Sequence, residues 1–171
     1  MSKTLGLAKR LIAAPSVTPA TGAVFDELEA MLIPLGFAVH RFRRGEGEEG
    51  SDEAPVENLF AIRLGPEGSS HFAFAGHLDV VPPGEGWASD PFEPTVRGEL
   101  LHGRGAVDMK SAIAAMVTAV EDVPREAGTI SFIITGDEEG PALHGTRALI
   151  DYMTAEGAIP DLCLVGEPTS V

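Results

Sequence analysis

Short apolar segments alternate with amphipathic helical segments through the second half of the chain. The apolar segments are residues 71–76, 99–103, 129–135 and 161–166. Helices are expected over residues 109–122 and 143–156, because apolar residues recur there at helical spacing. Strands that are apolar on both faces need helices on both sides, which is typical of a parallel sheet. The pattern predicts an α/β fold with a mostly parallel twisted sheet flanked by helices.

The first 64 residues are expected to form two amphipathic helices followed by two strands. Apolar residues at helical spacing stop before Pro15 and again before Gly36, where each helix should end. Residues 37–43 and 58–64 then have the composition of strands. A chain of 171 residues suits one domain with a sizeable core.

The loop between these two strands contains the spacing of a nucleotide-binding motif. Gly45, Gly47 and Gly50 spell G-x-G-x-x-G, which in dinucleotide-binding proteins opens a helix whose N-terminus binds a pyrophosphate. Here glutamates between and beside the glycines would repel that anion, and Pro55 follows where the helix should continue. We interpret the segment as a solvated loop and expect no such cofactor.

The chain is strongly acidic, with 26 Asp and Glu residues against 12 Lys and Arg residues and a formal net charge of -14. Phosphate-rich partners bind proteins by exchanging their counterions for Lys and Arg side chains, which this balance opposes. We therefore expect neither nucleic acid nor a membrane surface as a partner.

The single cysteine, Cys163, lies in the apolar run LCLV and is expected to be a buried thiol without a disulfide partner. The N-terminus lacks the uninterrupted apolar run of a signal peptide, and no segment approaches the ~20 apolar residues of a membrane span. These features predict a soluble, cytoplasmic protein.

Polar side chains follow the ends of the expected strands of the second half. They are His77, Asp79, Asp108, Asp137, Glu138, Glu139 and Glu167. Ligands of open α/β sheets bind at the carboxyl ends of the strands, so these segments should meet at one edge. Asp108 precedes a predicted helix, where a short carboxylate can cap the helix and face the same edge.

A histidine with several carboxylates and no thiolate is the donor set of a catalytic zinc, manganese or cobalt site. The number of acids exceeds what one divalent ion requires, which favours two ions about 3.5–4 Å apart. Taken singly, each residue has an ordinary alternative as a hydrogen-bonding, turn, capping or solvated side chain. The remaining histidines are expected to lie away from the site, except that a substrate role for His144 stays open.

Four motifs, GHLDVVP, GRGAVDMK, DEEGPALHGT and GEPTS, occur in this order. Together they resemble the dinuclear-zinc aminoacylase and carboxypeptidase-like metallohydrolases, and the last two motifs favour the desuccinylase branch of that family. By this resemblance His77 and Glu167 are ligands of one zinc, Asp108 bridges both ions, and Glu139 is a ligand of the second zinc. Cobalt or manganese are possible substitutes.

The resemblance also implies roles for two residues next to the metal ligands. Glu138 corresponds to the general base, which takes a proton from water and later delivers it to the leaving amine. Asp79 corresponds to the carboxylate that orients His77 through its other ring nitrogen. Because successive residues of an extended segment point to opposite sides, Glu138 and Glu139 are not expected to bind the same ion.

The implied reaction is hydrolysis of a small N-acyl amino acid, N-succinyl-L,L-diaminopimelate, to succinate and L,L-diaminopimelate. The family continues after GEPTS into a lid and dimerisation domain and then completes the catalytic sheet. Residues 1–171 therefore resemble the first part of the catalytic domain of a homodimeric enzyme and should be nearly inactive alone. A sibling deacylase such as acetylornithine deacetylase, a carboxypeptidase and a non-catalytic metal-binding module stay open as alternatives.

Overall fold

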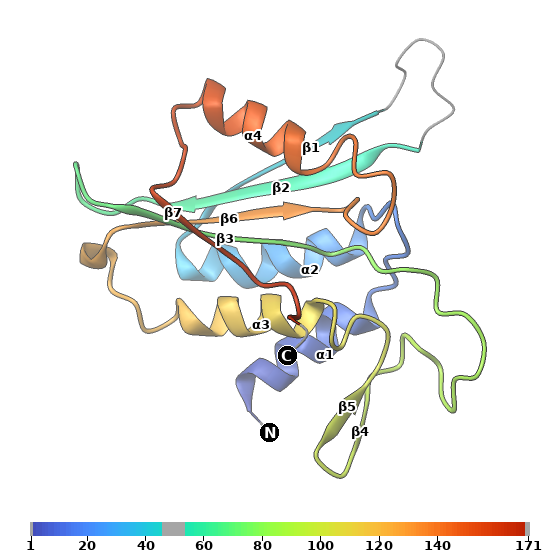
Figure 1. Ribbon diagram of the computed structural model, residues 1–171. Coiled ribbons are helices and arrows are strands. Elements are labelled where there is room, and N and C mark those ends of the chain that lie inside the picture. The colour runs from blue at the N-terminus through green and yellow to red at the C-terminus, as the bar shows by residue number, and fades with distance from the viewer. Residues whose placement is uncertain (1, 46–53, 170–171) are drawn as a thin grey trace.

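A five-stranded mixed sheet forms the centre of the computed structural model, which describes residues 2–45 and 54–169 (Figure 1). Its strands are β1 (Ala38–Arg44), β2 (Val56–Arg63), β3 (His71–His77), β6 (Thr129–Thr135) and β7 (Leu162–Val165). Their order across the sheet is β1-β2-β6-β3-β7. The predicted α/β class is confirmed.

The strands after residue 71 form the parallel half of this sheet, since β3 pairs in parallel with both β6 and β7. The earlier strands add an antiparallel half, in which β2 pairs with β1 and with β6. The sheet is thus parallel only around β3, and the carboxyl ends of β3 and β6 lie side by side because His77 pairs with Thr135.

Helices cover both faces of the sheet (Figure 1). On one face lie α1 (Lys3–Ala13), α2 (Ala23–Leu32) and α3 (Lys110–Ala119), and on the other lies α4 (Thr146–Ala155). Short 3-10 turns follow at η1 (Ile33–Leu35) and η2 (Arg125–Ala127). All four helices were predicted, and none of those in the described ranges is long and apolar enough to cross a bilayer.

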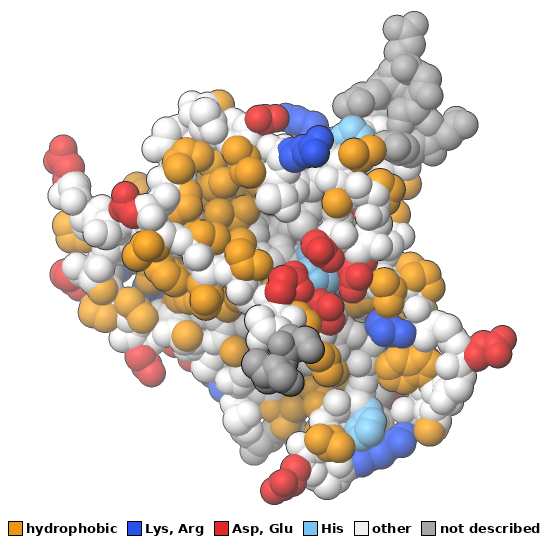
Figure 2. Space-filling model, viewed as in Figure 1, with side chains coloured by type: hydrophobic (Ala, Val, Ile, Leu, Met, Phe, Trp, Pro, Cys, Tyr) orange, Lys and Arg blue, Asp and Glu red, His pale blue; other side chains and the backbone are white. Residues whose placement is uncertain are grey.

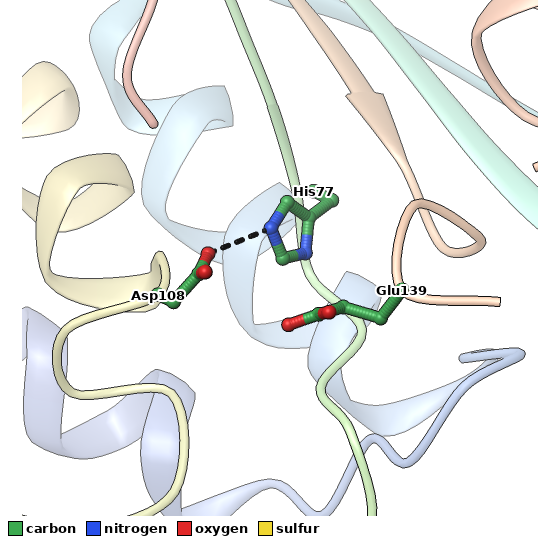
Figure 3. A group of neighbouring side chains, drawn as sticks. All are labelled: His77, Asp108 and Glu139. Atoms are coloured by element: carbon green, nitrogen blue, oxygen red, sulfur yellow. Dashed lines mark hydrogen bonds and ion pairs between the residues drawn. The ribbon is translucent and has the colours of Figure 1, made fainter. Parts of the chain in front are cut away.

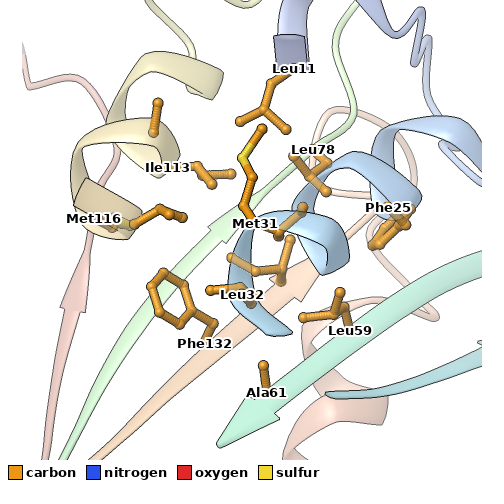
Figure 4. Packing of buried hydrophobic residues seen from close by; sticks show 14 of the residues in the cluster. Leu11, Phe25, Met31, Leu32, Leu59, Ala61, Leu78, Ile113, Met116 and Phe132 are labelled. Atoms are coloured by element: carbon orange, nitrogen blue, oxygen red, sulfur yellow. The ribbon is translucent and has the colours of Figure 1, made fainter. Parts of the chain in front are cut away.

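The core follows the twofold alternation of side chains along the strands. Leu59, Ala61 and Phe132 pack beneath α1, α2 and α3, as Figure 4 shows, whereas Phe60 and Ile133 face α4. Because both faces of β2 and β6 are covered, these strands are almost continuously buried. The apolar residues predicted along α3, from Ile113 to Val120, are buried in the larger of the two clusters.

Residues 99–103 do not add a strand to the main sheet, so that prediction is wrong. Leu100–His102 forms β5, which pairs only with β4 (Thr95–Arg97) in an antiparallel hairpin. The turn between them contains Gly98 with φ 63, a conformation that glycine adopts without strain. This turn reverses the chain, so that Leu100–His102 pairs with the strand just before it in the sequence. The hairpin projects away from the main sheet in Figure 1.

The prediction that Cys163 is buried is also wrong, because its side chain is exposed. Cys163 lies on β7, which pairs only with β3 and is exposed along its whole length. The apolar run predicted the strand correctly but not its place at the edge of the sheet, where α4 does not cover it. The glycine motif between β1 and β2 is described only at Gly45, and its other residues lie outside the described ranges.

Candidate metal centre

The site forms where β3 and β6 end together. His77 is the last residue of β3 and is fully buried, and the next amide, Leu78 N–H, donates to the carbonyl oxygen of Thr135 at 2.9 Å. This bond holds the segment after β3 against the segment after β6. The sheet therefore brings His77 and Asp79 next to Glu138 and Glu139, which lie about sixty residues further along the chain.

Asp79 connects the two segments through its buried carboxylate. Its Oδ2 atom accepts the backbone N–H of Glu138 at 3.0 Å and that of Glu139 at 2.9 Å. The same residue orients the histidine, because His77 Nδ1 lies 2.9 Å from the carbonyl oxygen of Asp79 and 3.4 Å from its Oδ1. A carbonyl can only accept a hydrogen bond, so Nδ1 carries the proton and Nε2 faces the site.

Carboxylates surround the Nε2 atom of His77 on several sides. Asp108 Oδ1 lies 3.0 Å from Nε2, Glu167 Oε1 lies 3.4 Å away and Glu138 Oε2 lies 3.8 Å away. Figure 2 shows these acids as a red cluster around a pale blue histidine, and Figure 3 shows Asp108 and Glu139 approaching the ring from two other segments. The four predicted metal ligands therefore converge on one place.

Their donor atoms fall into two groups that could each hold an ion. His77, Asp108 and Glu139 have donor atoms within 4.8 Å of one another, and so have His77, Glu138 and Glu167. Glu138 and Glu139 thus belong to different groups, in keeping with the alternation of an extended segment. Glu138 belongs to one of the two donor groups and its side chain is half exposed, so its role as the base stays a prediction.

The electrostatics of the site favour a cation. Burial and the charge of Asp108 raise the pKa of Glu139, and burial together with Asp108 raises the pKa of Glu167. Although burial alone would lower the pKa of His77, the charge and hydrogen bonds of Asp79 raise it to about 9. Burial opposes the ionised form of Asp79, but His77 and the two amide donors keep its pKa below the usual range. Positive charge is stabilised here, as a metal site requires.

Zinc binding to the chain should therefore strengthen with pH. Below about pH 9 the His77 ring is protonated and must lose a proton before Nε2 can bind a metal. Between about pH 6 and 8 we expect the apparent zinc affinity to rise roughly tenfold per pH unit. Competition titrations with a chelator at several pH values would measure this, and an affinity independent of pH over that range would contradict it.

The structure changes two expectations, one for Asp108 as a helix cap and one for Asp137 as a member of the site. Asp108 does not cap α3, because the N-cap residue is Met109 and no side-chain hydrogen bond caps the helix. Asp137 belongs to neither donor group. Its carboxylate accepts the backbone N–H groups of Leu143 and Ala142, while burial and the charge of Asp79 raise its pKa. The acidic triplet after β6 is thus divided between a turn and the candidate metal centre.

The other histidines lie apart from the two donor groups. His71 begins β3 at the opposite end of the strand and contacts Ser131 Oγ at 2.8 Å, and the ring of His40 stacks on Tyr152. His102 belongs to the hairpin. The carbonyl oxygen of His144 accepts a hydrogen bond from Asn58 at 2.9 Å, and nothing in the geometry tests whether its ring contacts a substrate.

A hollow of about 450 Å³ opens beside the carboxylates of Asp108 and Glu139. Trp87 and Arg104 form part of its wall, with the guanidinium carbon of Arg104 lying 5.3 Å from the centre of the Trp87 ring. Arg104 lies within the motif GRGAVDMK and Trp87 lies outside the motifs. Neither residue was singled out in the sequence, because the two side chains meet only in the fold. The hollow has room for a small molecule, with an aromatic ring and a cation close to the donor groups.

The fold and this donor set define a metallohydrolase-like catalytic domain. The sequence profile of peptidase family M20/M25/M40 matches residues 73–171, which is more than half of the chain. The chain belongs to this family.

Two curated relatives are highly similar along the whole chain. A succinyl-diaminopimelate desuccinylase of Erythrobacter litoralis is 85% identical over 171 residues, which are 100% of this chain and 45% of the relative. A protein of the same name from Novosphingobium aromaticivorans is 72% identical and matches 96% of this chain and 43% of its own length. The chain spans less than half the length of these relatives.

Solved structures share the fold at lower identity. Human carnosine dipeptidase 1 superimposes with a TM-score of 0.73 at 26% identity, covering 98% of this chain and 39% of its own. A metallo-carboxypeptidase of the M20 family from Sulfolobus solfataricus gives the same TM-score at 18% identity, covering 97% of this chain and 37% of its own. The second likeness shows the fold alone.

Proposed function

We propose that the chain supplies the first half of the catalytic domain of an enzyme that hydrolyses N-succinyl-L,L-diaminopimelate to succinate and L,L-diaminopimelate. The observation that carries the chemistry is the buried His77, whose Nε2 atom faces Asp108, Glu138 and Glu167. The 85% identity to a protein named for this reaction supports the substrate.

The donor set fits a pair of divalent metals. By the family resemblance, His77, Asp108 and Glu167 would hold one ion, and Asp108 and Glu139 would contribute to the other, whereas the geometry groups Asp108 and Glu139 with His77. In the neutral ring of His77 the Nδ1–H group donates a hydrogen bond to the carbonyl oxygen of Asp79, so the lone pair lies on Nε2 and is directed at the site. When bound, such ions polarise an amide carbonyl and lower the pKa of the attacking water. Two carboxylates lie beside His77 in each donor group, which is consistent with this charge.

Glu138 is the residue that we propose moves the proton. Its amide is held by Asp79, whereas its side chain is half exposed and therefore reaches solvent. It would accept a proton from water as the water attacks the amide carbon, and would deliver that proton to the nitrogen of the leaving amine. Asp79 keeps Glu138 and His77 in a fixed relation during both transfers.

The hollow beside the donor groups supports a succinyl group over an acetyl group. A succinyl group ends in a second carboxylate, and Arg104 is one of the residues that line the hollow. Its guanidinium lies over the Trp87 ring and donates to the carbonyl oxygen of Pro83 at 2.8 Å. Within the hollow that cation offsets the repulsion between an anionic acyl chain and the surrounding acids. An acetyl group offers no charge for this residue to bind.

The experiment that tests the function uses the complete protein that contains this chain. Purified with zinc, it should cleave N-succinyl-L,L-diaminopimelate with a kcat/KM at least about a hundredfold above that for N-acetylornithine or a dipeptide, since unpaired buried polar groups penalise the wrong substrate. Equal or better cleavage of N-acetylornithine would identify a sibling deacylase, and preference for a dipeptide would identify a peptidase. Metal binding without turnover of any of them would identify a binding module.

Several finer features stay predictions from the family resemblance. They are zinc as the metal, two ions in each complete site, cobalt or manganese as substitutes, a homodimeric assembly and a cytoplasmic location. The division of the longer protein into a catalytic domain and an inserted lid is likewise a proposal, and so is the near inactivity of residues 1–171 alone.

A further inference from the structure

A lysine next to the candidate metal centre is completely buried and bonds to none of its donors. Lys110 has an exposed fraction of 0%, and its Nζ atom donates to the carbonyl oxygens of Leu11 at 2.8 Å and Ala14 at 2.9 Å. A charged side chain is rarely buried so completely, since removing it from water is costly. The positions of these two carbonyl oxygens show which parts of the fold the buried Lys110 side chain connects.

Leu11 and Ala14 lie at the C-terminal end of α1, where the last carbonyl groups have no partner within the helix. Burial lowers the pKa of Lys110 to about 7, and its ammonium form matches the direction of the helix dipole at that end. Lys110 is the first residue of α3. The bond therefore joins the start of α3 to the end of α1, across nearly a hundred residues of sequence.

The segment that leaves α1 continues directly to the backbone around Asp79. Ser16 Oγ donates to the carbonyl oxygen of Leu78 at 2.7 Å, and Val80 N–H donates to the carbonyl oxygen of Ser16 at 2.9 Å. Thr18 N–H donates to the carbonyl oxygen of Val80 at 3.0 Å. The segment thus runs beside the backbone on both sides of Asp79.

On its other side, Lys110 is tied to the loop that carries Asp108. The two residues are separated only by Met109, and Lys110 N–H donates to the carbonyl oxygen of Gly105 at 3.0 Å. A Cβ atom on Gly105 would lie 2.9 Å from Lys110 Cδ and 3.0 Å from Val80 Cγ1, so the loop packs closely on both. A glycine is required there because its φ is also 85.

We propose that Lys110 is a positioning residue of the metal centre. Lys110 binds the end of α1, and Ser16, which follows α1, binds the backbone next to Asp79. By these contacts Lys110 fixes the position of the Asp108 loop relative to the segment of His77 and Asp79. These two segments supply donors to the same ion, so their relative position sets the metal geometry. The proposal rests on the metal centre of the proposed function, but it does not depend on the substrate.

The test uses the complete protein that contains this chain, loaded with Co²⁺, whose visible absorption reports the coordination geometry. Lys110→Met keeps the length of the side chain and removes its donor. We expect this variant to bind Co²⁺ about 10–100-fold more weakly, as is usual when a supporting partner of metal ligands is lost. The absorption bands of bound Co²⁺ should change in position or intensity. A variant that is merely less stable, but is folded and has Co²⁺ bound, would keep the spectrum of the unmodified protein.

Lys3→Met is the matched control, because Lys3 also joins α1 to the α3 region, through Glu121 Oε2 at 2.6 Å. It should leave both the affinity and the spectrum unchanged. Ser16→Ala removes only the contact to Leu78 and is the second variant if Lys110→Met does not fold. Weaker binding and an altered spectrum for Ser16→Ala would then support the proposal.

Three results would overturn the proposal. The first is a folded Lys110→Met chain with the affinity and spectrum of the unmodified chain. The second, where Lys110→Met does not fold, is a Ser16→Ala chain that binds and absorbs normally. The third is an unmodified complete protein that binds no Co²⁺, which would reject the metal centre itself and thus also the proposed function. Cleavage of another substrate by the complete protein would change the proposed reaction but leave the role of Lys110 intact.

Discussion

Replacing Glu138 by glutamine in the complete enzyme should lower kcat by about 10²–10⁴-fold while the metals stay bound, the usual loss when a positioned acid–base group is removed. The amide has nearly the same shape but cannot accept a proton from water. The backbone N–H of Glu138, which Asp79 holds, is unaffected by the change. Turnover and metal content, measured on the same preparation, would check this expectation.

Glu139→Gln is the matched control, because it makes the same chemical change one residue further along the same segment. A neutral amide oxygen is a much poorer ligand for zinc than a carboxylate. We therefore expect Glu139→Gln to lose the ion that this residue helps to hold. If Glu138→Gln instead empties a metal site and Glu139→Gln keeps both ions, the two roles are reversed, and normal activity of either variant would reject the mechanism.

Replacing Asp79 by asparagine should weaken metal binding by about 10–100-fold and lower turnover, although Asp79 is not a predicted ligand. The carboxylate accepts two backbone N–H groups and faces Nδ1 of His77. Asparagine has one acceptor oxygen and an NH₂ group that would face other donors, so it leaves buried groups unpaired at a cost of about 1–3 kcal/mol. Chelator competition and chemical denaturation would measure the two effects.

Asp161→Asn is a suitable control for this variant. Asp161 also accepts a backbone N–H, that of His71 at 2.8 Å, but it lies at the opposite end of β3. Its replacement should leave the metal affinity unchanged. A normal metal affinity for Asp79→Asn would show that His77 is oriented by the backbone carbonyl of residue 79 alone.

The strand and helix pattern and the chemistry of the centre could be predicted from the sequence. The strand over 129–135 and the helix at 109–122 were predicted from the local pattern of apolar residues. That pattern is the same whatever position the element takes in the fold. His77, Glu139 and Glu167 come together because the expected strands end at one edge, a rule that needs only the fold class. Asp108 reaches the same edge from the start of α3.

Only the tertiary structure decided which elements become neighbours. Cys163 lies in an apolar run that predicts burial, yet its strand occupies an edge and the thiol is exposed. The segment 99–103 has the composition of a sheet strand but pairs within a hairpin. Lys110 follows Asp108 in the sequence without any sign of its bond to α1, since that contact joins residues almost a hundred positions apart. Local pattern determines the type of each element, whereas burial and long-range hydrogen bonds depend on the packing of distant segments.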